Sequence, residues 1–284
     1  MAEKIIRPFG ISVSIDNLHQ AYFAACHEAG VYSVEISLRP QQYPTLDWDA
    51  LTELIQKNGL VINSVHLPFS RTLSISHPEK ENRDESMALN CAIMRAAAAH
   101  GVKIAVVHPS TEPNEEEDRP RIMGYAKENL KILAELGAEI GMTVAVEDLP
   151  RTCLGRNSAD MLELLSADSR LRACFDTNHL LSQPIADCVR AIGDKIVTLH
   201  VSDYDFIDER HLLPGELDID WAEFMDLLDE IGYTGVFTYE VNGAAENKFI
   251  RREAALTPAD YRKNYDSLVM REKPVVPAGE IIYR

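Results

Sequence analysis

Six histidine and carboxylate residues each stand at the end of a short apolar segment of this 284-residue chain. They are His66, His108, Glu147, Asp176, His200 and Glu240. His179 follows Asp176 by three residues, and Asp203 follows His200 by three. Imidazole and carboxylate groups are the donors that hold divalent ions such as Zn²⁺, Mn²⁺, Fe²⁺, Co²⁺ and Mg²⁺. If the fold brings these segment ends together, their residue types predict a metal site.

The apolar segments have the length and composition of buried parallel strands. We expect strands at residues 9–14, 33–37, 61–66, 104–108, 143–147, 173–176, 196–200 and 235–240. They are short and rich in valine and isoleucine, as strands buried on both faces are. Helix-like segments separate them, and six of these end at a glycine, which adopts the left-handed conformation after a helix without strain. These glycines are Gly30, Gly59, Gly101, Gly141, Gly193 and Gly232.

Eight strand–helix units in a chain of this length predict an α/β fold, a single-domain (β/α)8 TIM barrel over residues 1–284. The first strand lies near residues 9–14 and the eighth near 235–240, and a helix and tail follow residue 256. An open doubly wound sheet is the alternative, but no GxGxxG motif follows an early strand.

The longest connections follow strands, at residues 68–84, 109–119, 202–220 and 241–256. In a barrel they all lie at the carboxyl ends of the strands, where barrel active sites are built. Because side chains alternate along a strand, Glu147 points inward if Val144 and Val146 point outward. A ring of imidazoles and carboxylates is costly to desolvate unless a cation sits in it. The barrel therefore predicts a metal site at one mouth.

Other polar residues near this mouth have two interpretations. Glu35 in SVEIS faces inward, either as an ion-paired barrel residue or as part of the site. Arg210 and His211 precede a Pro-Gly turn, and they either close the barrel rim or contact a substrate or second metal. Arg151 is a candidate for binding a carboxylate or phosphate. The remaining histidines are interpreted as surface or packing residues: His19, His27, His77 and His100.

Composition excludes several classes of protein. The formal net charge is −17, which disfavours binding to nucleic acid or to an anionic membrane surface. The chain has no apolar run long enough for a transmembrane helix, and its N-terminus does not resemble a secretory signal. Its five cysteines are odd in number and widely spaced, which predicts free thiols in a reducing, cytoplasmic compartment.

Seven motifs in the chain resemble those of the xylose isomerase-like barrel superfamily. They are SVHLP, VVHPS, VAVEDLP, CFDTNH, LHVSD, HLLPGELDIDW and YEV, and the resemblance runs from the first strand to the eighth. The superfamily contains sugar-phosphate isomerases and epimerases, ketose 3-epimerases, hydroxypyruvate isomerases, inosose dehydratases and apurinic endonucleases.

The resemblance implies roles for particular residues. In isomerase and epimerase relatives, the positions that match Glu147, Asp176, His200 and Glu240 bind one divalent metal, here with Zn²⁺ or Mn²⁺ favoured. The positions that match Glu147 and Glu240 also act as acid and base. In endonuclease relatives further histidines hold additional zinc ions, and the matching residues are His66, His108, His179 and His211.

Three positions differ from particular subgroups of the superfamily. The segment after the fifth strand reads EDLP where xylose isomerases carry lysines. Cys153 stands where ketose 3-epimerases have a glutamate, and Leu217 replaces a glycine of the PGEG motif.

We therefore expect a divalent-metal-dependent isomerase or epimerase that acts on a sugar, sugar phosphate or hydroxy-keto acid. Proton transfer would pass through a metal-stabilised enediolate, with Glu147 and Glu240 as acid and base. The substrate, a small carbohydrate, would be held by residues of a second group: His66, His108, His179, His211 and Arg151. An inosose-type dehydratase or an apurinic-endonuclease-like metallohydrolase is the alternative, and a non-catalytic sugar-binding barrel is less favoured. The sequence also allows a homo-oligomer.

Overall fold

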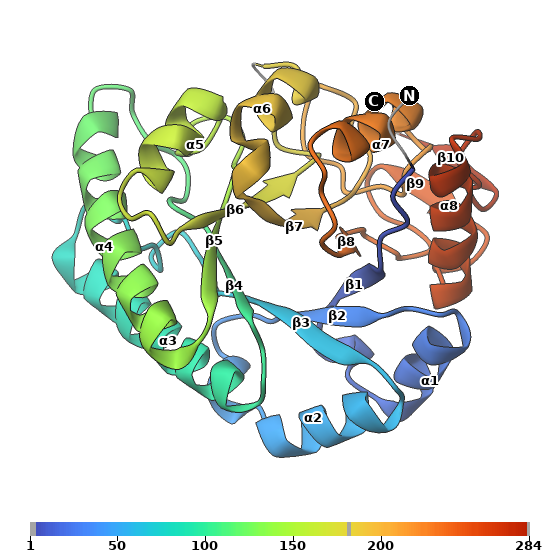
Figure 1. Cartoon of the computed structure of the whole chain (residues 1–284), viewed down its shortest axis with the longest axis horizontal. Coiled ribbons are helices and arrows are strands. Elements are labelled where there is room, and N and C mark those ends of the chain that lie inside the picture. The colour runs from blue at the N-terminus through green and yellow to red at the C-terminus, as the bar shows by residue number, and fades with distance from the viewer. Residues whose placement is uncertain (1–3, 181–182, 283–284) are drawn as a thin grey trace.

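The computed structural model describes residues 4–180 and 183–282. Eight parallel strands form one sheet in the order β7-β6-β5-β4-β3-β2-β1-β8, and helices surround it (Figure 1). A parallel bridge between Val201 and Tyr239 joins the end of β7 to β8. There the Val201 N–H donates to the Thr238 carbonyl over 2.8 Å, and the Glu240 N–H donates to the Val201 carbonyl over 3.1 Å. These bonds close the sheet and confirm the predicted (β/α)8 barrel.

Strands and helices alternate along the chain. The barrel strands are β1 Phe9–Val13, β2 Ser33–Ser37, β3 Val61–His66, β4 Ile104–Val107, β5 Thr143–Glu147, β6 Arg172–Asp176, β7 Ile196–His200 and β8 Phe237–Tyr239. The α-helices are α1 Gln20–Glu28, α2 Trp48–Lys57, α3 Lys80–Ala99, α4 Arg119–Ile140, α5 Ser158–Leu165, α6 Ile185–Ile192, α7 Trp221–Glu230 and α8 Pro258–Met270. Three short 3-10 helices are η1 Ile15–Asn17, η2 Tyr43–Thr45 and η3 Gly193–Lys195.

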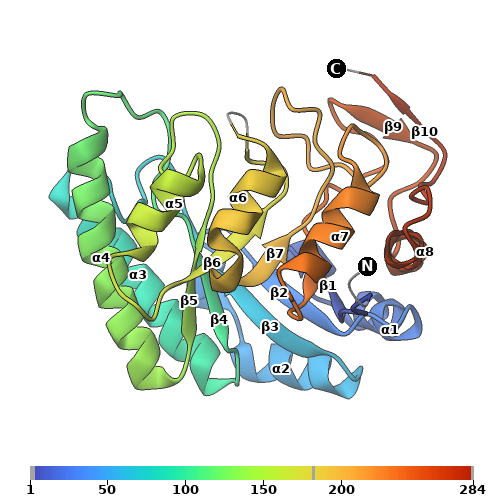
Figure 2. The ribbon, with the colours of Figure 1, turned by 45° about the horizontal axis from the view of Figure 1, so that its top comes forward.

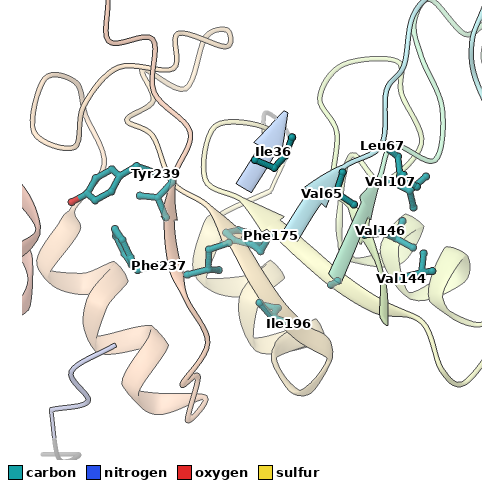
Figure 3. Packing of buried hydrophobic residues seen from close by; sticks show 14 of the residues in the cluster. Ile36, Val65, Leu67, Val107, Val144, Val146, Phe175, Ile196, Phe237 and Tyr239 are labelled. Carbon is teal, nitrogen blue, oxygen red and sulfur yellow. The ribbon is translucent and has the colours of Figure 1, made fainter. Parts of the chain in front are cut away.

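Apolar side chains pack in two separate places, as the alternation along the strands requires. Val144 and Val146 of β5 belong to the large buried cluster that lies between the strands and the helices (Figure 3). Ala145, between them, packs with Val106 and Cys174 in a small cluster of its own. Because β5 sends its valines outward, Glu147 at its end points to the barrel interior.

The glycines after the helices behave as expected with one exception. Five of the six have φ between 66° and 86°, in the left-handed region. The prediction is wrong for Gly193, which has φ −54° and begins η3. A Cβ at this position would lie 3.0 Å from the Ile231 side chain, so the close packing of this side chain favours glycine there.

The connections that follow the strands rise above the ring of helices in Figure 2, on the side where β9 and β10 lie. β9 (Ile250–Arg252) and β10 (Gly279–Ile281) pair in an antiparallel ribbon that the sequence did not predict. Each strand has only three residues, too few for an alternation pattern, and β10 lies in the C-terminal tail. Among the described residues, no helix has the length and apolar character needed to cross a bilayer.

Two glycines of α4 provide a paired test of the packing between this helix and β5. A Cβ at Gly137 would lie 2.5 Å from the Met142 carbonyl oxygen, whereas a Cβ at Gly124 would meet nothing within 4 Å. We expect Gly137→Ala to destabilise the protein by about 1–3 kcal/mol through this clash. Gly124→Ala should stabilise it by up to about 1 kcal/mol, because alanine favours helix. Urea unfolding measures both, and an equal effect of the two substitutions would contradict this packing.

Candidate metal centre and catalytic pocket

The predicted donors converge at the carboxyl ends of the strands. Glu147, Asp176, His200 and Glu240 offer one ligand atom each, and these four atoms all lie within 4.8 Å of one another. His200 ends β7, Asp176 ends β6 and Glu147 ends β5, while Glu240 follows β8 directly. The barrel therefore brings together donors from four consecutive strands, as their residue types predicted.

Glu147 lies at the centre of this arrangement. Its Oε2 is 3.1 Å from Nε2 of His66 and 3.1 Å from Nε2 of His108. Its Oε1 is 2.9 Å from Nδ1 of His200, and that nitrogen is 3.3 Å from Oε2 of Glu240. The Glu147 side chain is only 1% exposed, whereas that of Glu240 is 25% exposed. Glu147 thus forms the floor of the site, and Glu240 borders the solvent.

One buried carboxylate oxygen in the donor group allows a test of whether the site suits a metal ion. Oδ2 of Asp176 is buried without a hydrogen bond. Its Oδ1 accepts a bond from the Asn178 N–H over 2.6 Å, whereas Oδ2 has only the Nε2 atom of His179 at 3.6 Å, beyond hydrogen-bond distance. An unsatisfied buried carboxylate oxygen is costly. A divalent ion shared with Glu147, His200 and Glu240 would satisfy it, so the residues present fit the group.

Charge relations in the cluster favour the binding of a cation. Burial raises the pKa of Asp176 well above its usual range, and the neighbouring carboxylates Glu240 and Glu147 add to the effect. Burial would also raise the pKa of Glu147, but His200 and His108 outweigh it and hold that pKa well below its usual range. Asp176 is therefore the carboxylate that most needs a cation beside it.

Glu35 supports His200 from below. Nε2 of His200 lies 2.9 Å from Oε1 of Glu35, although the two are not aligned for a hydrogen bond. Ser12 donates to Oε1 of Glu35 over 3.1 Å, and Ser64 donates to Oε2 over 2.7 Å. These contacts favour the interpretation of Glu35 as an ion-paired residue of the barrel interior over its interpretation as part of the site. With Nε2 facing Glu35, His200 presents Nδ1 to the other donors.

His179 and His211 form a second group with Glu209, and one ligand atom from each lies within 4.8 Å of the others. Nε2 of His179 is 3.0 Å from Oε1 of Glu209, and its Nδ1 is 2.6 Å from the Asp148 carbonyl oxygen. Burial would raise the pKa of Glu209, but hydrogen bonds from His179 and Arg151 lower it to about 2. Glu209 was not among the sequence candidates, although Arg210 and His211 beside it were, because no local pattern distinguishes it from the other acidic residues of this connection.

The Arg151 side chain faces the same pocket but is bound to three acidic residues. Its Nε is 2.8 Å from Oε1 of Glu112, its Nη1 is 2.5 Å from Oδ1 of Asp208, and its Nη2 is 2.6 Å from Oε2 of Glu209. These contacts join three connections at the barrel mouth. The Arg151 guanidinium is thus held by acidic partners while its side chain still lines the cavity, and its role in binding a substrate carboxylate or phosphate stays a prediction.

Two further rim residues hold the loop after β7. Asp203 accepts backbone hydrogen bonds from Gly215, Leu217 and Ile219 over 2.6–3.2 Å, so it fixes the Pro-Gly turn and lies outside the donor group. Arg210 pairs with Asp205 over 2.7 Å, which supports its structural interpretation. His211, the next residue, instead lines the pocket.

A cavity of about 440 Å³ opens above the donors. Its lining includes His66, His108, Glu147, His179, Glu240 and Phe69. The ring of Phe69 is 44% exposed and stacks on that of His108, with centroids 3.7 Å apart. The sequence analysis missed Phe69, although its place three residues after His66 in HLPF was a usable signal.

The barrel and its mouth define a class, a (β/α)8 protein with a histidine and carboxylate centre at the carboxyl ends of its strands. Residues 23–263 match the family model described as xylose isomerase-like TIM barrel, and the chain belongs to this family. Fructoselysine 3-epimerase of Shigella flexneri is 28% identical over 210 residues, which cover 69% of this chain and 74% of the relative. An uncharacterised protein of Methanocaldococcus jannaschii is 28% identical over 201 residues, covering 66% of this chain and 68% of that protein.

Solved structures share the fold at lower identity. D-Psicose 3-epimerase from Clostridium cellulolyticum H10 superposes with a TM-score of 0.72 at 16% identity, covering 94% of this chain and 96% of the other. A D-tagatose 3-epimerase-like protein gives a TM-score of 0.70 at 23% identity, covering 83% and 90%. At these identities the likeness establishes the fold.

Proposed function

We propose that this protein is a divalent-metal-dependent sugar epimerase or isomerase that moves a proton at the carbon next to a substrate carbonyl. The observation that carries the proposal is the convergence of Glu147, Asp176, His200 and Glu240 at the floor of an open cavity. The epimerase names of the relatives support the reaction class.

Glu147, Asp176, His200 and Glu240 would hold the metal. When bound, a divalent ion supplies Lewis acidity that polarises a carbonyl and makes the neighbouring C–H acidic. The protein's own side chains would hold the ion and transfer the proton. Asp176 and His200 are fully buried, so they would serve as ligands without taking part in proton transfer.

Glu147 and Glu240 are suited to carry the proton because they flank the same centre from different strands. One carboxylate takes the proton from the substrate carbon, and the other returns a proton to the opposite face for epimerisation or to the adjacent carbon for isomerisation. Glu240, with its partly exposed side chain, can exchange its proton with solvent. Exchange with water resets both groups after each turnover.

Phe69 and the histidines give the cavity a wall suited to a sugar. The exposed ring of Phe69 offers an apolar face to the C–H groups of a substrate, and it excludes water from the side of His108. His66 and His108 lie within 3.1 Å of Glu147 and present imidazole nitrogens at the rim of the donor group. Both imidazoles hold Glu147 in place. His66 also contacts the Leu67 carbonyl oxygen through Nδ1 over 3.1 Å, so His108, which contacts Glu147 through Nε2, is the better placed of the two to bond a substrate hydroxyl.

Deuterium wash-in tests the proposal. Metal-loaded protein in D₂O is expected to introduce deuterium beside the carbonyl of at least one compound in a panel of ketoses and ketose derivatives, as read by NMR. Loss of water with growth of an enone absorbance would indicate a dehydratase instead. Binding without exchange or product would leave a non-catalytic sugar-binding barrel and overturn the proposal.

A further inference from the structure

A second cavity of about 280 Å³ adjoins the catalytic one. Arg71, Thr111 and Glu112 line both, so the two spaces meet at these residues. The second cavity lies between the connection after β3 and the connection after β4, away from the donor group. A substrate that enters the catalytic cavity with its reacting end can therefore extend into the second one.

The lining of the second cavity is polar. It contains four hydroxyl side chains and one amide, those of Thr72, Ser74, Ser76, Thr111 and Asn114. Ile122 and two prolines supply its apolar part. Such a lining fits a short chain that ends in hydrogen-bonding groups, and not an aromatic or a long alkyl group.

Some of the charged side chains that line this cavity form ion pairs within the protein, and others do not. The carboxylates of Glu112 and Asp118 are bound to Arg151 and Arg121 respectively. In contrast, Arg71 and Glu115 are both exposed, and within residues 4–180 and 183–282 neither side chain has a hydrogen bond or ion pair to the protein. The second cavity thus presents one unpaired cation and one unpaired anion to whatever fills it.

We infer that the second cavity binds the amino-acid end of a sugar-linked substrate, with its carboxylate on Arg71 and its ammonium on Glu115. This inference rests on the proposed function and specifies its substrate class: a ketose joined to an amino acid through nitrogen. A phosphate fits less well, because it would bring two negative charges into a cavity whose lining has one arginine and the carboxylates of Glu112, Glu115 and Asp118. An uncharged second sugar would leave both charges unpaired.

The experiment compares fructoselysine with a matched analogue that carries a butyl group in place of the amino acid. In wild-type protein, deuterium wash-in should show a higher kcat/KM for fructoselysine than for the butyl analogue and for fructose 6-phosphate. In Arg71→Ala, the ratio of fructoselysine to butyl analogue should fall about 10- to 100-fold, the effect expected for a hydrogen-bonded charge pair. Arg71→Lys should retain part of the preference, and Glu115→Gln should lower it independently.

Arg39→Ala removes another exposed arginine that lines neither cavity, and it should leave the ratio unchanged. An equal loss for both compounds in Arg71→Ala, or a preference for fructose 6-phosphate, would overturn the inference. If no compound in the panel exchanges, the proposed function fails, and calorimetric titration with fructoselysine still tests the subsite. Equal affinity of wild type and Arg71→Ala in that titration would exclude it.

Discussion

Replacing Glu240 with glutamine is expected to lower the deuterium exchange rate by about 10²- to 10⁴-fold, the range for a positioned acid or base. Glutamine keeps the size of the side chain and a carbonyl oxygen, but it cannot accept and return a proton. The substitution lies at a partly exposed position after β8, so the barrel should remain folded. Exchange at the wild-type rate would remove Glu240 from the mechanism.

Glu246→Gln is the matched control for this prediction. Glu246 lies six residues further along the same connection, where its side chain pairs with Arg251 over 2.9 Å on the surface. It lines neither cavity, so this variant should exchange at the wild-type rate. The bound metal of Glu240→Gln is measured beside its rate, because Glu240 belongs to the donor group. A slow variant that still holds metal separates proton transfer from metal loss.

Replacing Asp176 with asparagine is expected to abolish tight metal binding. This position contributes the buried oxygen that lacks a partner, and asparagine offers a neutral ligand in its place. We expect metal affinity to fall by at least about 100-fold, beyond the 10- to 100-fold cost of losing a residue that only supports a ligand. Titration calorimetry with Zn²⁺ and Mn²⁺ measures the change.

Thermal unfolding provides a readout of the same substitution that does not depend on activity. A ligand that binds only the folded state raises the free energy of unfolding, by about 4 kcal/mol at a thousandfold excess over its Kd. Metal should therefore raise the melting temperature of wild type, and a chelator should reverse the change. Asp176→Asn should show neither effect, while Asp187→Asn, an exposed aspartate in α6, should behave as wild type. The same metal-dependent shift in Asp176→Asn would contradict the assigned centre.

Local patterns in the chain were sufficient to predict the barrel and to propose the donors at its mouth. Strand length, valine and isoleucine content and the glycines after helices are local properties, and they located eight strands. Because side chains alternate with a period of two, the residue at the end of each strand has a direction that the sequence specifies, as for Glu147. The residue types at Asp176 and His200 then indicated a cation.

The contacts of the remaining polar residues, in contrast, follow from the folded arrangement of the connections. Arg151 was a candidate anion ligand by residue type, but Glu112, Asp208 and Glu209 reach it from other connections and occupy its guanidinium. No sequence pattern singled out Arg71. Its exposed side chain nevertheless lines two cavities, and it makes no hydrogen bond or ion pair with the part of the chain that the structure describes. These pairings join residues of separate connections, whose conformations no short periodicity specifies. Whether a charge is compensated depends on such long-range contacts, and so only the folded chain reveals it.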